Sequence, residues 1–274
     1  MQKLYEFGFP SAGHIPSLKK MWIEVFGDDE YSVNSFFEKT QSNENTICAF
    51  YNGAPVSALY AVEAEIFFEK KSYSAYYIYG VCTHPDHRGK GLMRGIISSL
   101  EVVAKDRGIS YLYLVPAEEA LFSLYERLGY KTAFSLKEKE FVNFDVGECP
   151  KYDLGVNYID YQKLRKEQCM CPITVLGEHG FECFLPQRPV GDLTVLSIPD
   201  EGYAVCECQN DTIMVHELWG DREKLLKCVF DSSKASSLVL REPARCGGRP
   251  FGMLKSLDSS PLFENGFIGI PYGG

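Results

Sequence analysis

The sequence YYIYGVCTHPDHRGKGLMRGIISSL, residues 76–100, contains the pattern that decides the fold of this chain. Its first seven residues, Tyr76 to Cys82, are aromatic, β-branched or small, which is typical of a buried strand. Pro85 ends that strand, because proline cannot continue a hydrogen-bonded ladder. Apolar residues then recur with helical spacing at Leu92, Ile96, Ile97, Leu100 and Val103. The pattern therefore predicts a strand, a loop and a helix in that order.

Glycines mark the start of the predicted helix, where Gly89 and Gly91 flank Lys90. Glycine leaves the unsatisfied N–H groups of the first helical turn uncovered, and the helix dipole makes that end positive. Arg88, Lys90 and Arg94 add positive charge. We expect a phosphate or pyrophosphate to bind here. The alternative is an ordinary strand-to-helix turn with a solvated basic rim.

The loop differs from two common phosphate loops, since the sequence has neither G-x-x-x-x-G-K-[ST] nor G-x-G-x-x-G. It resembles instead the acetyl-CoA loop of the GNAT superfamily of N-acetyltransferases, R/Q-x-x-G-x-G/A, which Arg88 and Gly91 match. Met93 departs from the usual Gly or Ala at the last position. That departure, followed by Arg94, is similar to the enhanced-intracellular-survival type of GNAT protein.

A second segment supports the resemblance. Residues 111–115 (YLYLV) predict a strand that Pro116 ends, and residues 117–128 predict a helix that Gly129 closes. The string LYERLGY, residues 124–130, resembles the GNAT signature Y-x-x-x-G-[FY]. The two motifs stand in the family's order, and the resemblance covers roughly residues 1–145.

The resemblance implies an α/β fold, a mixed sheet flanked by helices. Further helices are expected at 17–26 and 33–39, and strands at 46–51, 55–68 and 134–144, with a hairpin turn at Asn52-Gly53. We expect two domains: a GNAT acetyl-CoA-binding catalytic domain at 1–147 and a smaller, degenerate GNAT-like domain at 148–274.

The second half repeats the β-β-α-β order of the first. Its predicted elements are a helix at 158–169, a hairpin at 202–208 and 212–219, a helix at 221–230 and a strand at 237–241. It has no glycine loop between strand and helix, so we expect no second acetyl-CoA site. The alternative is an unrelated α/β cap.

The resemblance also implies roles for single residues. The strand Gly80–Thr83 would bind the pantetheine arm of acetyl-CoA through its backbone, and Gly80 allows a bulge there. The residues expected to contact acetyl-CoA are Val81, Cys82, Thr83, Arg88, Gly89, Lys90, Gly91, Leu92, Met93, Arg94, Ala120 and Leu121.

Tyr125 is the implied general acid, although a tyrosine at helical spacing among leucines is more often a core residue. A tyrosine of pKa near 10 protonates a thiolate of pKa near 8.5 at a cost of roughly 2 kcal/mol. Tyr125 therefore has either a lowered pKa or a role as hydrogen-bond donor to the thiolate.

The sequence does not identify the general base. The resemblance implies the terminal carboxylate, that of Gly274, as a catalytic group. Glu63 and Glu65 alternate with apolar residues on the strand beside the cofactor strand, where they either face a substrate cleft or form a solvated face. Glu118 and Glu119 favour the start of their helix.

Composition excludes several classes of function. The net charge is −9 and neither half of the chain is basic, which argues against nucleic acid as a partner. No apolar run reaches membrane-spanning length, and the N-terminus lacks a signal-peptide core. The ten cysteines then indicate reduced thiols in a cytoplasmic protein.

Two C-x-C pairs, Cys169/Cys171 and Cys206/Cys208, could form a zinc site with His179 and His216, but buried thiols are the expected state and we expect no metal. The predicted function is transfer of an acetyl group from acetyl-CoA to a primary amine of a small molecule or peptide. The alternative is a non-catalytic acetyl-CoA-binding or sensing module. Assembly into a homo-oligomer is left open, since the longer relatives often assemble.

Overall fold

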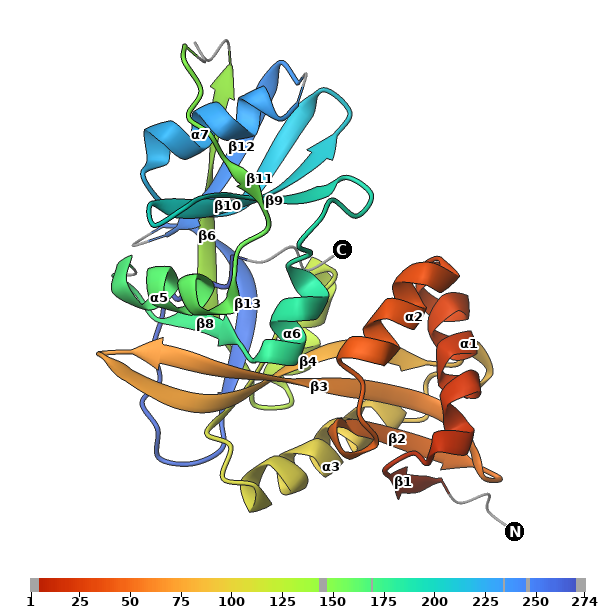
Figure 1. The fold of residues 1–274 in the computed structure, drawn as a ribbon. Coiled ribbons are helices and arrows are strands. Elements are labelled where there is room, and N and C mark those ends of the chain that lie inside the picture. Colours follow the sequence, from red (N-terminus) through yellow and green to blue (C-terminus); the bar gives the residue numbers. More distant parts are fainter. Residues whose placement is uncertain (1–4, 143–146, 169, 234, 245–246, 270–274) are drawn as a thin grey trace.

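The computed structural model describes residues 5–142, 147–168, 170–233, 235–244 and 247–269 (Figure 1). Within them, thirteen strands form one mixed sheet with helices on both faces, which confirms the predicted α/β class. The strands are β1 (Glu6–Gly8), β2 (Thr46–Tyr51), β3 (Ala54–Phe68), β4 (Lys71–Thr83), β5 (Tyr111–Leu114), β6 (Lys131–Val142), β7 (Asp153–Leu154), β8 (Ile173–Leu176), β9 (Leu193–Ile198), β10 (Gly202–Gln209), β11 (Thr212–Gly220), β12 (Ser237–Pro243) and β13 (Arg249–Ser256). The helices are α1 (Ile15–Phe26), α2 (Glu30–Lys39), α3 (Leu92–Asp106), α4 (Glu119–Glu126), α5 (Tyr158–Gln168), α6 (Glu178–Phe184) and α7 (Arg222–Asp231).

The sheet runs in the order β1-β2-β3-β4-β5-β13-β6-β12-β11-β10-β9-β7, with β8 paired to β3. Two parallel pairs interrupt its antiparallel pattern, β4 with β5 and β11 with β12. Each pair is connected by one helix, α3 in the first half and α7 in the second. Parallel neighbours need such a crossover. The predicted repeat of strand and helix order is therefore present in the structure.

Strands from both sides of residue 147 share the sheet. β13 lies between β5 and β6, and β8 extends the sheet along β3. In Figure 1 the long strand β6 runs from the lower half of the molecule into the upper half, where it pairs with β12. The division into domains at residue 147 stays a prediction, but the two halves are joined by backbone hydrogen bonds.

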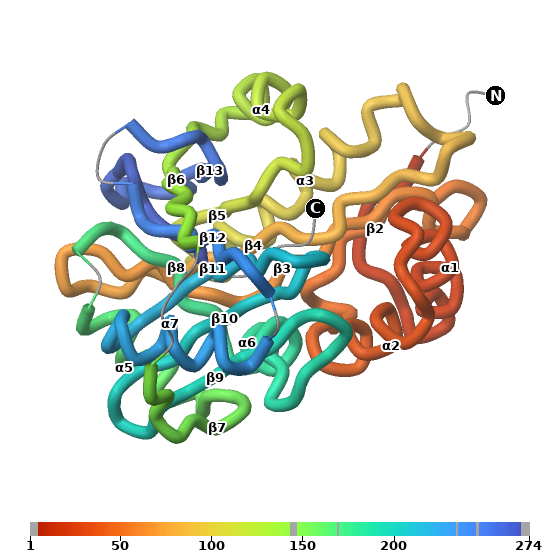
Figure 2. The backbone as a smooth tube through the Cα atoms, turned by 90° about the horizontal axis from the view of Figure 1, so that it is seen from above, coloured from red at the N-terminus to blue at the C-terminus, as the bar shows by residue number. Residues whose placement is uncertain are grey.

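Helices cover the first-half strands on opposite faces, with α1 and α2 on one face and α3 and α4 on the other (Figure 2). Trp22 of α1 and Phe36 of α2 pack against Tyr60 and Tyr79 of the sheet. Ile96 and Leu100 of α3 are buried in the second cluster. The helical stripe read from the sequence is thus the buried face of α3.

Most predicted bounds agree with the structure to within a few residues, and the differences have local causes. Helix α2 begins at Glu30 rather than Val33, because the Asp29 carboxylate caps it by accepting from the Ser32 N–H at 3.0 Å. Strand β4 begins at Lys71 rather than Tyr76, because a tight turn with positive φ at Glu69 and Lys70 joins it directly to β3. The elements β1, β7, β8, β9, α6 and β13 were not predicted from the sequence.

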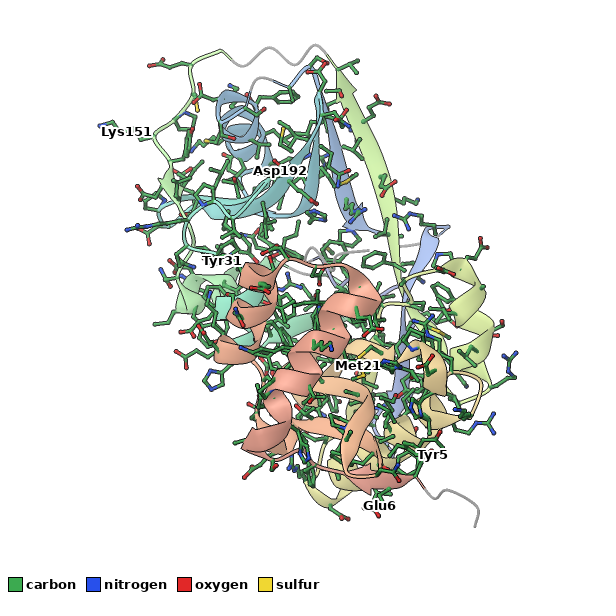
Figure 3. The ribbon with its side chains drawn as sticks, turned by 90° about the vertical axis from the view of Figure 1, so that its right-hand side faces the viewer. Tyr5, Glu6, Met21, Tyr31, Lys151 and Asp192 are labelled. Carbon is green, nitrogen blue, oxygen red and sulfur yellow. The ribbon has the colours of Figure 1, made fainter. Side chains whose placement is uncertain are left out.

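Figure 3 shows the side chains of both halves, with Met21 on α1 and Tyr31 on α2 in the lower half and Asp192, before β9, in the upper half. None of the helices in the described segments is both long and apolar enough to cross a membrane. The cysteines of those segments include eight free thiols: Cys48, Cys82, Cys149, Cys171, Cys183, Cys206, Cys208 and Cys228.

Candidate active site

The site begins where β4 and β5 separate. The two strands pair only from Ala75–Tyr77 to Tyr111–Tyr113. A bulge follows in β4, since Ala58 lies opposite Cys82 while Tyr60 lies opposite Tyr79. Such a bulge bends its strand and re-aims it. The strands therefore diverge and leave an opening in the sheet.

Gly80 makes the bulge possible. Its φ is +58°, in the left-handed region that favours glycine. A Cβ atom at Gly80 would lie 2.6 Å from Cζ3 of Trp22, so a larger residue displaces the indole ring. The bulge at Gly80, which the sequence predicts, is thus confirmed.

Backbone groups of β4 face the opening. The N–H of His84 donates to the carbonyl of Val56 at 2.9 Å, and the directions of backbone groups alternate along an antiparallel pair. Thr83 therefore turns its N–H and C=O away from β3, toward the opening. Cys82 has the opposite direction, and its carbonyl accepts from Ser57 Oγ at 2.8 Å. Val81 is half-buried and lines the opening.

The predicted anion site lies at the start of α3. Gly91 is the N-cap residue with φ +76°, and Gly89 has φ +71°. No atom lies within 4 Å of a Cβ built at either glycine, so space above the first helical turn is open. The N–H groups of that turn have no partner within the helix. A phosphate group would fit this uncovered, positive end.

Basic side chains surround the same loop. Arg88, Lys90 and Arg94 are exposed. Arg88 Nε donates to the carbonyl of Thr83 at 3.1 Å, and Lys90 Nζ donates to that of Asp86 at 2.7 Å. Both bonds fix the loop while its cations remain in solvent. Leu92 and Met93, in the first turn of α3, instead pack into the core.

A cavity of about 960 Å³ extends through the opening. Its wall includes three of the residues predicted to contact acetyl-CoA or to act in catalysis: Val81, Leu121 and Tyr125. Ala120 is exposed on α4 and lies outside that wall. Gly274 lies outside the described residues, so its predicted role stays a prediction.

Tyr125 is buried beside the cavity and meets Tyr130 edge-on, with 5.8 Å between ring centroids. Burial raises the pKa of Tyr125 to about 12. The alternative of a lowered pKa is therefore wrong for this tyrosine. A hydroxyl of high pKa remains protonated and is suited to donate a hydrogen bond.

The acidic candidates separate into two groups. Glu63 and Glu65 lie on the part of β3 that faces β8, and Glu65 pairs with Lys166. Neither residue is part of the cavity wall. Glu118 and Glu119, read from the sequence only as helix-start residues, stand at the cavity wall and are exposed.

Sequence reasoning missed several residues of the cavity wall. Trp22 donates from Nε1 to Asp28 Oδ2 at 2.7 Å on one side. Arg241, Arg249 and Phe251 stand there too, and come from β12 and β13. No local pattern could have found them, because they reach the cavity only through the insertion of β13 beside β5 and the pairing of β12 with β6.

Cys169, one member of the zinc alternative, lies outside the described residues, so that alternative is not tested as a whole. Among the described residues, no three His, Cys, Asp or Glu side chains form a group that could bind a metal ion. His216 contacts Glu207 instead, with 3.0 Å between Nε2 and Oε2. Cys206 is buried, and burial raises the pKa of its thiol to about 12.

Comparison with known proteins gives a match in the first half. Residues 10–133 match the family model described as the acetyltransferase (GNAT) domain. An acetyltransferase of Pectobacterium atrosepticum is 43% identical over 61 residues, which are 22% of this chain and 41% of that protein. An acetyltransferase of Yersinia pestis matches with the same identity and coverage. The matched segment thus spans less than half the length of these relatives.

Solved structures share the fold over nearly the whole chain. A GCN5-related N-acetyltransferase from Anabaena variabilis has a TM-score of 0.73 at 15% identity, covering 93% of this chain and 73% of its own. The corresponding protein from Kribbella flavida has a TM-score of 0.70 at 14% identity, covering 94% and 72%. Eis1 from Mycobacterium abscessus has a TM-score of 0.68 at 13% identity, covering 92% and 74%.

Proposed function

We propose that this protein, whose residues 10–133 match the acetyltransferase (GNAT) domain, transfers an acetyl group from acetyl-CoA to a primary amine of a small molecule or peptide. The family match supports the resemblance to the GNAT superfamily, and the likeness to Eis1 supports the enhanced-intracellular-survival type at the level of the fold. The acyl donor, the amine and the reaction itself are the proposal.

One observation carries the proposal: β4, with its bulge at Gly80, leads through a short loop directly into the glycine-capped N-terminus of α3. In the proposed complex, the pyrophosphate lies on the N–H groups of residues 89–94. The pantetheine arm follows the edge of β4 and bonds to the backbone of Thr83. The thioester then reaches the cavity between Val81 and Tyr125. Binding of this kind places the reacting carbon beside an incoming amine.

The chemistry needs a neutral amine and a stabilised leaving group. The amine nitrogen bonds to the acetyl carbon, the C–S bond breaks, and the thiolate takes up the proton that the nitrogen loses. Full proton transfer from Tyr125, with a pKa of about 12, to a thiolate of pKa near 8.5 is uphill by roughly 5 kcal/mol. Tyr125 therefore stabilises the thiolate by donating a hydrogen bond.

The proposal extends to the setting of the enzyme. Free thiols in the described residues fit a cytoplasmic location. The amine is the partner that we propose, either free or as part of a peptide. The Gly274 carboxylate stays our candidate base.

The test is calorimetric titration of the protein with acetyl-CoA, with CoA as the control. We expect saturable binding at one site, followed by thiol release when an amine panel is added. No binding at millimolar ligand would overturn the proposal. Binding without thiol release for any amine would favour a non-catalytic sensing module instead.

A further inference from the structure

Two arginines of the second half stand in the wall of the cavity. Arg241 lies near the end of β12 and Arg249 at the start of β13, and both reach the ring of Phe251 with 5.8 Å from guanidinium carbon to ring centroid. The Arg241 side chain is only 19% exposed, whereas that of Arg249 is 51% exposed. The cavity therefore has a cationic wall that the first half alone does not supply.

The two guanidinium groups share one carboxylate. Glu138 Oε1 accepts from Arg241 Nε at 3.2 Å and from Arg249 Nη2 at 2.8 Å. One negative charge against two positive charges leaves this part of the wall positive. Guanidinium groups bind carboxylate and phosphate through paired N–H donors, and they bind them more strongly where water is partly excluded.

A neutral histidine positions Arg241. Arg241 Nη1 lies 2.9 Å from His216 Nδ1, and a guanidinium can only donate, so Nδ1 is the acceptor. The ring proton is then on Nε2 and is donated to Glu207 at 3.0 Å. Burial lowers the pKa of His216, which keeps the ring neutral. Arg241 is thus fixed from two sides, by His216 and by Glu138.

The same contact closes a second strand opening. β11 and β12 pair from Thr212–Val215 to Ser237–Leu240 and then separate, as β4 and β5 do. His216 is the extra residue of a bulge in β11, since Val205 lies opposite Glu217 and Cys206 opposite Val215. The side chains of His216 and Arg241 meet where these strands separate. In the first half the corresponding opening is the cavity.

The N-terminus of α7 in the second half is closed, whereas the N-terminus of α3 in the first half is open. At the start of α7, the Asp221 carboxylate accepts from the N–H of Lys224 at 3.2 Å. The chain's own anion therefore occupies the helix end where α3 is left uncovered. The second half thus lacks an open anion site and supplies Arg241 to the cavity of the first.

The cavity wall also contains acidic residues, which would attract a positively charged group. Asp28 and Glu118 stand in the cavity wall with exposed carboxylates, and neither lies on β12 or β13. Carboxylates attract an ammonium group, while Arg241 and Arg249 repel one. A polycation would meet both the attractive and the repulsive part of this wall. An acceptor with one amine and one anionic group matches both parts.

We propose that the acceptor is a small amine that also carries a carboxylate or phosphate group, which Arg241 and Arg249 bind. This inference rests on the proposed acetyl transfer. It makes the two arginines specificity-determining residues supplied by the second half. It also assigns His216 a positioning role, because its ring fixes the guanidinium of Arg241.

The test compares amines that differ only in the anionic group. The pairs are amino acids with their amides for carboxylate, and phosphoethanolamine with ethanolamine and glucosamine 6-phosphate with glucosamine for phosphate. Thiol release from acetyl-CoA gives kcat/KM for each. We expect at least one anionic member to exceed its neutral partner by tenfold or more, and the better series identifies the anion.

Variants locate the effect. R241Q and R249Q should each lower kcat/KM for the preferred anionic amine by about tenfold, mainly through KM, and should not lower it for the neutral partner, which has no anionic group to lose. R188Q, which removes an exposed arginine outside the cavity wall, is the matched control and should change neither value.

Three outcomes would overturn the inference: neutral amines or polyamines react as well as the anionic ones, R249Q and R241Q affect both members of a pair equally, or no anionic amine reacts although acetyl-CoA binds. If the unsubstituted protein does not bind acetyl-CoA, the proposed function itself is overturned. Titration of each variant with acetyl-CoA separates the two cases, since neither arginine lies at the α3 loop.

Discussion

At the residue scale, single side chains decide whether the opening in the sheet exists and what it can do. Because Gly80 has no Cβ atom, Trp22 can pack directly against the bulge. Tyr125 is the proposed hydrogen-bond donor to the leaving thiolate, and burial raises the pKa of its hydroxyl. His216 fixes the direction of a guanidinium while remaining neutral. Each gives a prediction that one substitution can test.

Replacing Gly80 with alanine should distort the bulge. G80A combines a left-handed φ with a Cβ atom 2.6 Å from Trp22. G53A is the matched control, because Gly53 has φ +78° and open space around its Cβ. We expect G80A to cost about 1–3 kcal/mol more stability than G53A and to weaken acetyl-CoA binding. Urea unfolding and calorimetry measure both, and equal losses in the two variants would contradict this role of Gly80.

Removing the Tyr125 hydroxyl should slow turnover without changing cofactor affinity. A hydrogen bond to a charged group contributes about 1.5–3 kcal/mol, so Y125F should lower kcat by roughly 10–100-fold. Y130F is the control, because the adjacent Tyr130 hydroxyl is buried without a hydrogen-bond partner. Steady-state kinetics and acetyl-CoA titration report the two quantities. A parallel fall of affinity and turnover in Y125F would rule out the role.

Acid should destabilise the fold through His216. Its folded pKa lies below the usual 6.5, with Glu207 and Arg241 as the charged groups facing it. The unfolded chain therefore takes up a proton that the folded chain refuses, so stability is full above pH 6.5 and falls below it. Between pH 7.5 and 5.5 the loss should be on the order of 1 kcal/mol. Thermal unfolding should show that acid lowers the stability of H216Q less than that of the unsubstituted protein. An equal loss of stability in both proteins would mean that another group causes the pH dependence.

At the element scale, one helix end and two strand ends make the site. The N-terminus of α3 is uncovered because glycine precedes it, whereas that of α7 is capped by Asp221. β4 and β5 separate after three residue pairs, and the cavity opens where they do. The site is thus a property of element ends, where backbone groups lack partners.

A substitution at the start of α3 should affect ligand binding more than one at its other end. Gly91 and Gly108 flank the helix, both with positive φ and open space around the Cβ. G91A and G108A should therefore lose similar stability, about 1–2 kcal/mol each. We expect acetyl-CoA affinity to fall in G91A only, because its methyl group enters the proposed phosphate position. Unchanged affinity in G91A would place the phosphate elsewhere.

At the scale of the whole molecule, the two halves are built into one sheet. β13 separates β5 from β6, and its residues Met253 and Leu254 are buried with first-half side chains. Phe267 also reaches the first-half core and bridges to Ile173 of β8. The cavity wall depends on the same arrangement, because Arg249 and Phe251 lie on β13.

Residues 1–147 expressed alone should fail to unfold cooperatively. Without β13, the edges of β5 and β6 lose their partners, and unpaired edges favour aggregation. Co-expression with residues 148–274 should restore solubility and acetyl-CoA binding. Circular dichroism and size-exclusion chromatography measure the outcome. A soluble 1–147 fragment with a sharp unfolding transition would instead support an autonomous first domain.

The sequence by itself determined the local elements: the strand before Pro85, the glycine-capped helix after it, the bulge at Gly80 and the hairpin at Asn52-Gly53. These depend on backbone preferences and side-chain periodicity over a few neighbouring residues. They also carried the family resemblance and with it the α/β fold. The loop residues from Arg88 to Arg94 are recognisable for the same reason, because their pattern is local.

Only the tertiary structure decided which distant segments meet. The place of β13 between β5 and β6, the arrival of Arg241 and Arg249 at the cavity, and the burial that raises the pKa of Tyr125 to about 12 all follow from long-range strand pairing. Pairing between strands more than a hundred residues apart leaves no periodic or turn signal, because its free energy comes from packing summed over the whole sheet.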